Sequence, residues 1–164
     1  EALIFIGFLA AYWAMRLHAP QWPPAGSVEM PTAVPLVMTV LLVSSSFTIH
    51  AAESAFEHAD RSRFLRWLVI TMVLGAAFLA LSMIEWGELM HHGFKIDTNV
   101  YGTAFYSITG FHGAHVLVGL CVFLALLVPA LGGRTNEAFL KSASMYWHFV
   151  DIVWLFVVSQ VYFW

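Results

Sequence analysis

The sequence predicts an all-α integral membrane protein, a bundle of five transmembrane helices forming one domain over residues 1–164. First, 60% of the 164 residues are hydrophobic and only 10% are charged, which is too apolar for a soluble domain. Second, five long apolar runs alternate with short connections, and about 20 residues cross a hydrocarbon core. Third, these runs lack the alternation of barrel strands, so helices must satisfy the backbone in lipid.

We expect the first helix over residues 1–17, where an almost unbroken apolar run follows Glu1. The 13 apolar residues 2–14 span only about 20 Å as a helix, so we expect this span to begin upstream of the sequence. Pro20, Pro23, Pro24 and Pro31 prevent helix in the next connection. The second helix is expected over residues 33–56.

The third helix is predicted over residues 66–90, after a tight connection, the fourth over residues 102–128 and the fifth over residues 142–162. Short connections place the basic residues at alternate sides of the membrane. One side carries five of them and the other carries two, Arg16 and Lys95. The positive-inside rule makes the richer side cytoplasmic, which predicts a cytoplasmic N-terminus and an outside C-terminus. The five are Arg61, Arg63, Arg66, Arg134 and Lys141.

Charge and motifs exclude several functions. The net charge is −3 and the seven Lys and Arg residues are scattered, so no basic face for nucleic acid is expected. No Ser, Cys or Thr stands in a motif with a base and an orienting acid, and no glycine-rich phosphate loop occurs. The sequence therefore predicts no catalytic residue in this chain.

Two histidines in the fourth helix are the first informative polar residues, because ionisable groups in a bilayer cost several kcal/mol. His112 and His115 are three residues apart and share a helix face. No Cys, Asp or Glu lies nearby to complete a metal shell. We therefore expect interhelical hydrogen bonds rather than metal ligation, with Gly110 and Ala114 allowing a close helix approach.

His148 and Asp151 repeat this spacing in the fifth helix. An imidazole beside a carboxylate lowers the cost of burying both. We expect a polar clamp that fixes this helix to its neighbours. A proton relay is the alternative, because histidine titrates near neutral pH.

Two glutamates complete the predicted polar seam. Glu85 lies near the outer end of the third helix, where we expect it to act as a structural hydrogen-bond acceptor. Glu1 stands before an apolar helix. It is either a first-turn residue favoured by the helix dipole or an intramembrane acid.

Two long motifs carry a family resemblance. The fourth helix contains Phe105-Tyr106-x-x-Thr109-Gly110-Phe111-His112-Gly113-x-His115-Val116, and the fifth contains Tyr146-Trp147-His148-Phe149-Val150-Asp151-x-Val153-Trp154-Leu155-Phe156. In this order they closely resemble cytochrome c oxidase subunit III. The resemblance extends to Trp22-Pro23-Pro24 in the outer loop and to Glu85, and so covers essentially the whole chain.

The resemblance implies a short, five-helix bacterial form in the cell (inner) membrane. Such a subunit holds no haem or copper of its own, because these belong to the partner subunits. It packs directly against oxidase subunit I, assembles with subunit II, binds phospholipid, and supports stability and proton uptake during oxygen reduction. The segment that starts at Glu1 resembles the one whose carboxylate reacts with carbodiimide in the family.

Two alternatives remain open at this point. The first is subunit III of a quinol oxidase, or the related accessory protein of nitric oxide reductase, although Tyr146-Trp147 and Trp22-Pro23-Pro24 favour the cytochrome c type. The second is a membrane cytochrome whose histidines clasp a haem between helices. Its candidate ligands are His50, His112, His115 and His148.

Overall fold

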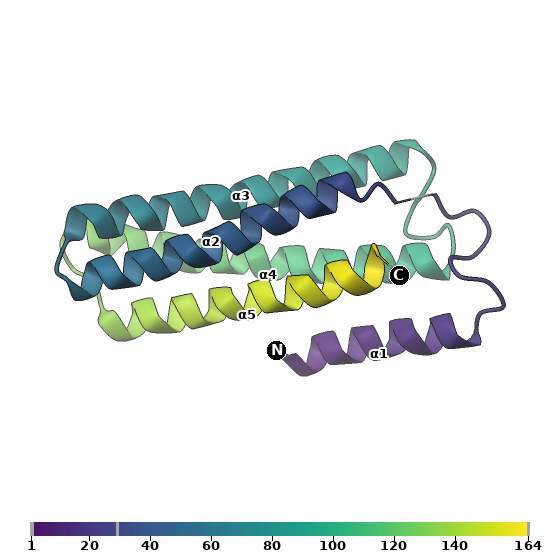
Figure 1. Ribbon diagram of the computed structural model, residues 1–164, viewed down its shortest axis with the longest axis horizontal. Coiled ribbons are helices and arrows are strands. Elements are labelled where there is room, and N and C mark those ends of the chain that lie inside the picture. The colour runs from purple at the N-terminus through teal and green to yellow at the C-terminus, as the bar shows by residue number, and fades with distance from the viewer. Residues whose placement is uncertain (1, 29, 164) are drawn as a thin grey trace.

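A computed structural model describes residues 2–28 and 30–163, and shows five helices joined by short connections (Figure 1). Within these residues the chain has the all-helical class that the sequence predicts. The helices are α1 (Ala2–His18), α2 (Ala33–Glu57), α3 (Arg61–His91), α4 (Val100–Leu131) and α5 (Glu137–Val161).

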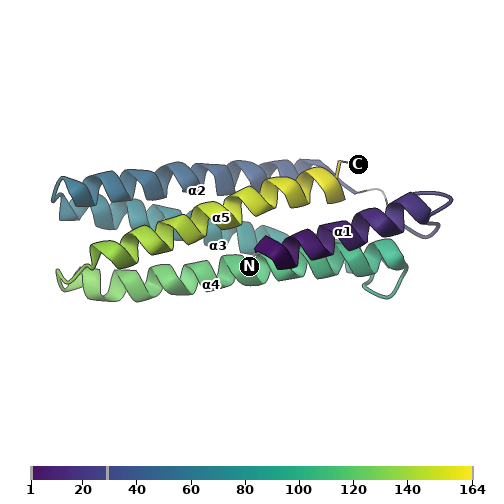
Figure 2. The same ribbon diagram turned by 90° about the horizontal axis from the view of Figure 1, so that it is seen from below.

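The four longer helices form a bundle in which each packs against two neighbours. α2 contacts α3 and α5, and α4 contacts the same two helices, while α1 packs against α4. Seen from below, α1 lies alongside α4 near α5, and its N-terminal end stops partway along the bundle (Figure 2). The α1 helix is therefore attached to a core that the other four helices make.

Four of these helices are long and apolar enough to cross a membrane, namely α2, α3, α4 and α5. The α1 helix has 17 residues and is apolar but shorter. The chain is thus a multi-pass membrane protein by the length and composition of its described helices. A fifth crossing by α1 remains a prediction.

Three helices begin earlier than expected, and side chains cap all of them; α4 starts at Val100 rather than residue 102, with Asn99 as its cap. α3 starts at Arg61 rather than residue 66, since the Asp60 side chain accepts a hydrogen bond from the Arg63 backbone N–H at 3.0 Å. α5 starts at Glu137 rather than residue 142, since Asn136 accepts from the Phe139 N–H at 3.2 Å. Capped first turns that contain charged residues therefore extend α3 and α5 beyond the expected apolar segments.

The two ends of the bundle differ in chemistry. The connections from α2 to α3 and from α4 to α5 lie together at one end (Figure 1). The expected cytoplasmic set of basic residues lies near these connections, so we call this the basic end; its members are Arg61, Arg63, Arg66, Arg134 and Lys141. The proline-rich loop lies at the opposite end, where Trp22 Nε1 donates to Tyr12 Oη at 3.2 Å.

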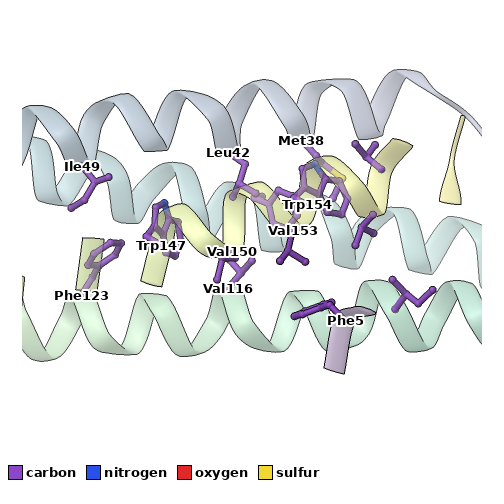
Figure 3. Packing of buried hydrophobic residues seen from close by; sticks show 14 of the residues in the cluster. Phe5, Met38, Leu42, Ile49, Val116, Phe123, Trp147, Val150, Val153 and Trp154 are labelled. Carbon is purple, nitrogen blue, oxygen red and sulfur yellow. The ribbon is translucent and has the colours of Figure 1, made fainter. Parts of the chain in front are cut away.

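One tryptophan fills the space where four helices meet. Trp147 of α5 is fully buried, and a Cβ on Gly75 of α3 or Gly119 of α4 would lie 2.6 or 2.7 Å from its ring. Figure 3 shows the ring among apolar side chains that include Phe123 and Val150. Glycine at these two positions is what lets the indole enter the bundle.

Candidate functional site

The inward face of α5 carries the polar residues of the candidate site. Ser144, Trp147, Asp151, Trp154 and Val158 are all buried, and their spacing of three or four residues places them on one helix face. This face is directed into the bundle. It explains why an apolar span contains a buried carboxylate and two buried indoles.

His148 and Asp151 both meet Ser46 of α2. The Ser46 hydroxyl lies 3.0 Å from His148 Nδ1 and also hydrogen-bonds Asp151 Oδ2. Because Asp151 is only 6% exposed, this contact satisfies part of a carboxylate that lipid could not solvate. The two residues expected to form a clamp therefore contact one hydroxyl on the neighbouring helix.

Two tryptophan bonds flank the Ser46 contact. Trp147 Nε1 donates to Ser45 Oγ at 2.8 Å, and Trp154 Nε1 donates to Thr39 Oγ1 at 3.0 Å. Together with the Ser46 contacts they join α5 to α2 from Trp147 to Trp154. The sequence prediction did not include Thr39, Ser45 or Ser46, although two serines that follow Thr39 by six and seven residues on an apolar helix were a usable signal.

Glu85 lies at the opposite end of the bundle from the basic residues. It is 4% exposed, and Tyr162 Oη donates to its Oε2 at 2.7 Å. Tyr162 caps α5, so this bond joins the end of α5 to α3. Glu85 thus acts as an acceptor in the structure, with a partner that the sequence did not indicate.

His112 and His115 occupy different surroundings on α4. His115 Nδ1 lies 2.8 Å from the Phe111 carbonyl of its own helix. His112 is 1% exposed and packs between Trp154 and Phe78, with ring centroids 5.1 and 5.6 Å away. Neither nitrogen of His112 has a hydrogen-bond partner among the described residues, so the interhelical bond expected for it is replaced by aromatic packing.

The candidate haem or metal ligands are distributed over the bundle. The His50 side chain is 79% exposed near the basic end, where its Nδ1 lies 3.8 Å from Glu53 Oε2, whereas His112 is buried among aromatic rings. No group of three or more His, Cys, Asp or Glu side chains suited to a metal ion occurs within residues 2–28 and 30–163. The carboxylate candidate Glu1 lies outside the described residues.

Apolar grooves run along the outside of the bundle. One of about 260 Å³ lies between α1 and α4, with Phe8, Met15 and Ile108 in its lining. Two others, of about 410 and 340 Å³, follow the junction of α3 and α4. Their walls have the chemistry of acyl chains rather than of a polar substrate.

Comparison with known proteins gives one consistent result. The family model described as cytochrome c oxidase subunit III matches residues 1–164. Similar proteins include cytochrome c oxidase subunit 3 of Synechocystis sp., 37% identical over 99% of this chain and 70% of that protein. Cytochrome c oxidase subunit 3 of Thermostichus vulcanus is 36% identical over 99% of this chain and 81% of that protein. The same subunit of Struthio camelus is 36% identical over 100% of this chain and 65% of that protein.

Proposed function

Because the chain belongs to the cytochrome c oxidase subunit III family, we propose that it is the non-catalytic subunit III of a haem-copper cytochrome c oxidase in aerobic respiration. The observation that carries this proposal is the family match over all 164 residues. The names of the relatives favour cytochrome c over quinol as the electron donor of the complex. Haem and copper then belong to the partner subunits, and oxygen reduction takes place there.

The role we propose for this chain is to support subunit I. The hydrogen bonds of His148, Asp151 and Glu85 hold α5 against α2 and α3, which keeps the bundle in one shape. A rigid bundle presents a constant apolar surface to a partner, and Leu36, Val40 and Phe47 of α2 are among its exposed apolar residues. Subunit I is the proposed direct partner, and subunit II completes the complex.

Bound phospholipid is part of the same proposal. The groove between α1 and α4 is apolar and opens toward the surroundings of the bundle, so an acyl chain fits its chemistry. We propose that the complex lies in the bacterial inner membrane. The basic end is then cytoplasmic, because the positive-inside rule favours that orientation. The N-terminal side of α1 then faces the cytoplasm and the C-terminus lies outside.

Glu1 is proposed as the intramembrane carboxylate that influences proton uptake. A hydrophobic carbodiimide should modify Glu1 in the assembled complex before it modifies Glu137, whose side chain is 61% exposed at the basic end. Mass spectrometry of proteolytic fragments reads both sites. Equal labelling of the two glutamates would remove the special role of Glu1.

Co-purification tests the proposed function. With an affinity tag on this chain, a mild detergent extract should yield a complex that contains haem and copper and oxidises reduced cytochrome c. After the subunits are separated, the Soret band should stay with the partners. A Soret band that follows this chain would instead support the membrane cytochrome.

A further inference from the structure

Polar side chains line the junction of α2 and α5 from the basic end inward. On each helix these side chains follow one another at intervals of three or four residues, so each set lies on one helix face. We call these residues the polar file. Its members are Ser46, His50, Glu53 and Glu57 of α2 and Glu137, Lys141, Ser144, His148 and Asp151 of α5.

The polar file leads from water into the bundle. Exposure falls along α5, where the Glu137 side chain is 61% exposed, Ser144 is 1% and Asp151 is 6% exposed. On α2 the side chain of Glu53 is 22% exposed, and that of His50 is 79% exposed and lies at the outer edge of the polar file. At the mouth, Lys141 Nζ donates to Glu137 Oε1 at 2.7 Å within α5. From Glu57 to Ser46 the file rises about 16 Å, roughly half of a hydrocarbon core.

The polar file ends at Asp151. One turn further along α5, Trp154 is 1% exposed and its indole is hydrogen-bonded to Thr39. Met38 and Leu42 of α2 are also buried, and Figure 3 shows them among the apolar side chains that pack between α2 and α5. The junction is thus polar on the side of the basic end and closed by aromatic and apolar side chains on the other.

Two buried oxygens in the polar file have unused hydrogen-bonding capacity. Asp151 Oδ1 and Ser144 Oγ are buried without a hydrogen-bond partner in the described part of the chain. Buried polar atoms in this state cost free energy, so their retention points to a ligand that is small and polar. A proton, carried by water, is a ligand of this kind, and both atoms belong to residues of the polar file.

We propose that Asp151 is a proton-binding site that exchanges with the aqueous phase at the basic end through His148 and Ser46. In one state the imidazolium Nδ1–H donates to Ser46 Oγ, whose own proton is donated to the Asp151 carboxylate. Transfer breaks the Nδ1–H and old Oγ–H bonds and forms a new Oγ–H and an Oδ2–H bond. It leaves a neutral imidazole with its proton on Nε2 and a neutral carboxylic acid, so charge and protons balance.

The ionisable groups of the polar file favour exchange with the basic end, because they all lie on that side of Asp151. On the polar file they are His148, His50, Glu53, Glu57, Glu137 and Lys141, all toward the basic end. From α4 the ionisable neighbours are His112, which packs on Trp154, and His115, which packs on Phe5 of α1. The site needs no redox centre, so the proposal does not depend on the proposed oxidase function.

Infrared spectroscopy of the purified complex tests the proposal. A carboxylic acid C=O band should appear as the pH falls, shift in D₂O, and be missing in Asp151→Asn. Its hydrogen–deuterium exchange should slow by about 100-fold in Ser46→Ala, since positioned proton transfer contributes at least that much. Ser46→Thr keeps the hydroxyl and should exchange normally, and Thr39→Ala is the control for loss of a hydroxyl outside the polar file.

Three results would overturn the proposal. They are a band that survives in Asp151→Asn, exchange that is unchanged in Ser46→Ala, and equal slowing in Thr39→Ala. If Ser46→Ala releases the subunit, His148→Asn replaces it, because the Asn amide can donate where Nδ1 does but cannot carry a proton. Slow exchange in His148→Asn supports the proposed relay, and wild-type exchange there contradicts it.

Discussion

At the scale of single residues, the cost of a charge in lipid explains why the two buried carboxylates in the spans, Asp151 and Glu85, each have a hydrogen-bond partner. An Asp at the centre of a spanning helix costs about 2.5 to 3.5 kcal/mol on insertion. Asp151 offsets part of this through Ser46, and Glu85 through Tyr162. Each contact joins two helices, so the pairing that tolerates the charge also fixes the packing.

Substitutions of Asp151 separate its structural role from an obligatory catalytic one. Asp151→Asn keeps an acceptor for the Ser46 hydroxyl, and we expect the subunit to stay in the complex with near-normal initial oxygen consumption. Asp151→Leu leaves the Ser46 hydroxyl without its carboxylate acceptor. Leaving a buried group unsatisfied costs about 1 to 3 kcal/mol of stability, so this variant should lose the subunit during purification. Subunit stoichiometry and oxygen uptake measure both effects. An intact Asp151→Asn complex with little initial activity would mean that Asp151 is essential for turnover.

The residues of the polar seam could be predicted from the sequence, but their partners could not. Glu85, His148 and Asp151 were conspicuous because charged groups are rare in apolar helices. Ser46 and Tyr162 are ordinary residues of membrane helices, and only the packing of α5 against α2 and α3 brings them to the carboxylates. For His112 the sequence predicted a hydrogen bond where the fold provides aromatic rings.

At the scale of helices, α5 depends on close contact with its neighbours. It is the most buried of the candidate spans, because half of its most apolar 18-residue segment lies inside the bundle. Its indole at Trp147 touches positions on α3 and α4 that only glycine leaves open, and it hydrogen-bonds Ser45 of α2. The position of one side chain therefore fixes three helix contacts.

Adding a methyl group on α4 tests this packing. In Gly119→Ala the new Cβ would lie 2.7 Å from the Trp147 ring, and such overpacking costs about 1 to 3 kcal/mol. We expect weaker retention of the subunit and a lower dissociation temperature of the complex in detergent. Gly113→Ala is the matched control, since its nearest neighbour would be 3.8 Å away. Equal behaviour of the two variants would show that Trp147 is not tightly held.

Helix existence and order followed from the apolar runs, whereas helix ends did not. The first turns of α3 and α5 look like loop because charged residues interrupt their apolar ones, such as Phe64 and Phe139. Asp60 and Asn136 cap these helices by accepting a hydrogen bond from the backbone N–H of the residue three positions later. The structure shows these bonds, and the sequence alone does not. Apolar patterns mark what is buried in lipid, and capped ends extend beyond that boundary.

At the scale of the whole molecule, the two ends of the bundle predict its orientation. We replace the single native cysteine, exposed Cys121, with alanine, and introduce Ser62→Cys at the basic end or Ala25→Cys in the opposite loop. A membrane-impermeant thiol reagent should label Ser62→Cys only from the cytoplasmic side and Ala25→Cys only from outside. The reverse pattern would show that the distribution of basic residues does not set the topology.

The central claim, that this chain supports oxygen reduction without performing it, is tested most directly by enzyme assembled without it. The measurement is oxygen consumption by the depleted and complete complexes, followed from the first turnovers until activity stops. We predict similar initial rates, and earlier inactivation of the depleted enzyme. Loss of the initial rate in a depleted complex that keeps subunits I and II and their haem would contradict the claim.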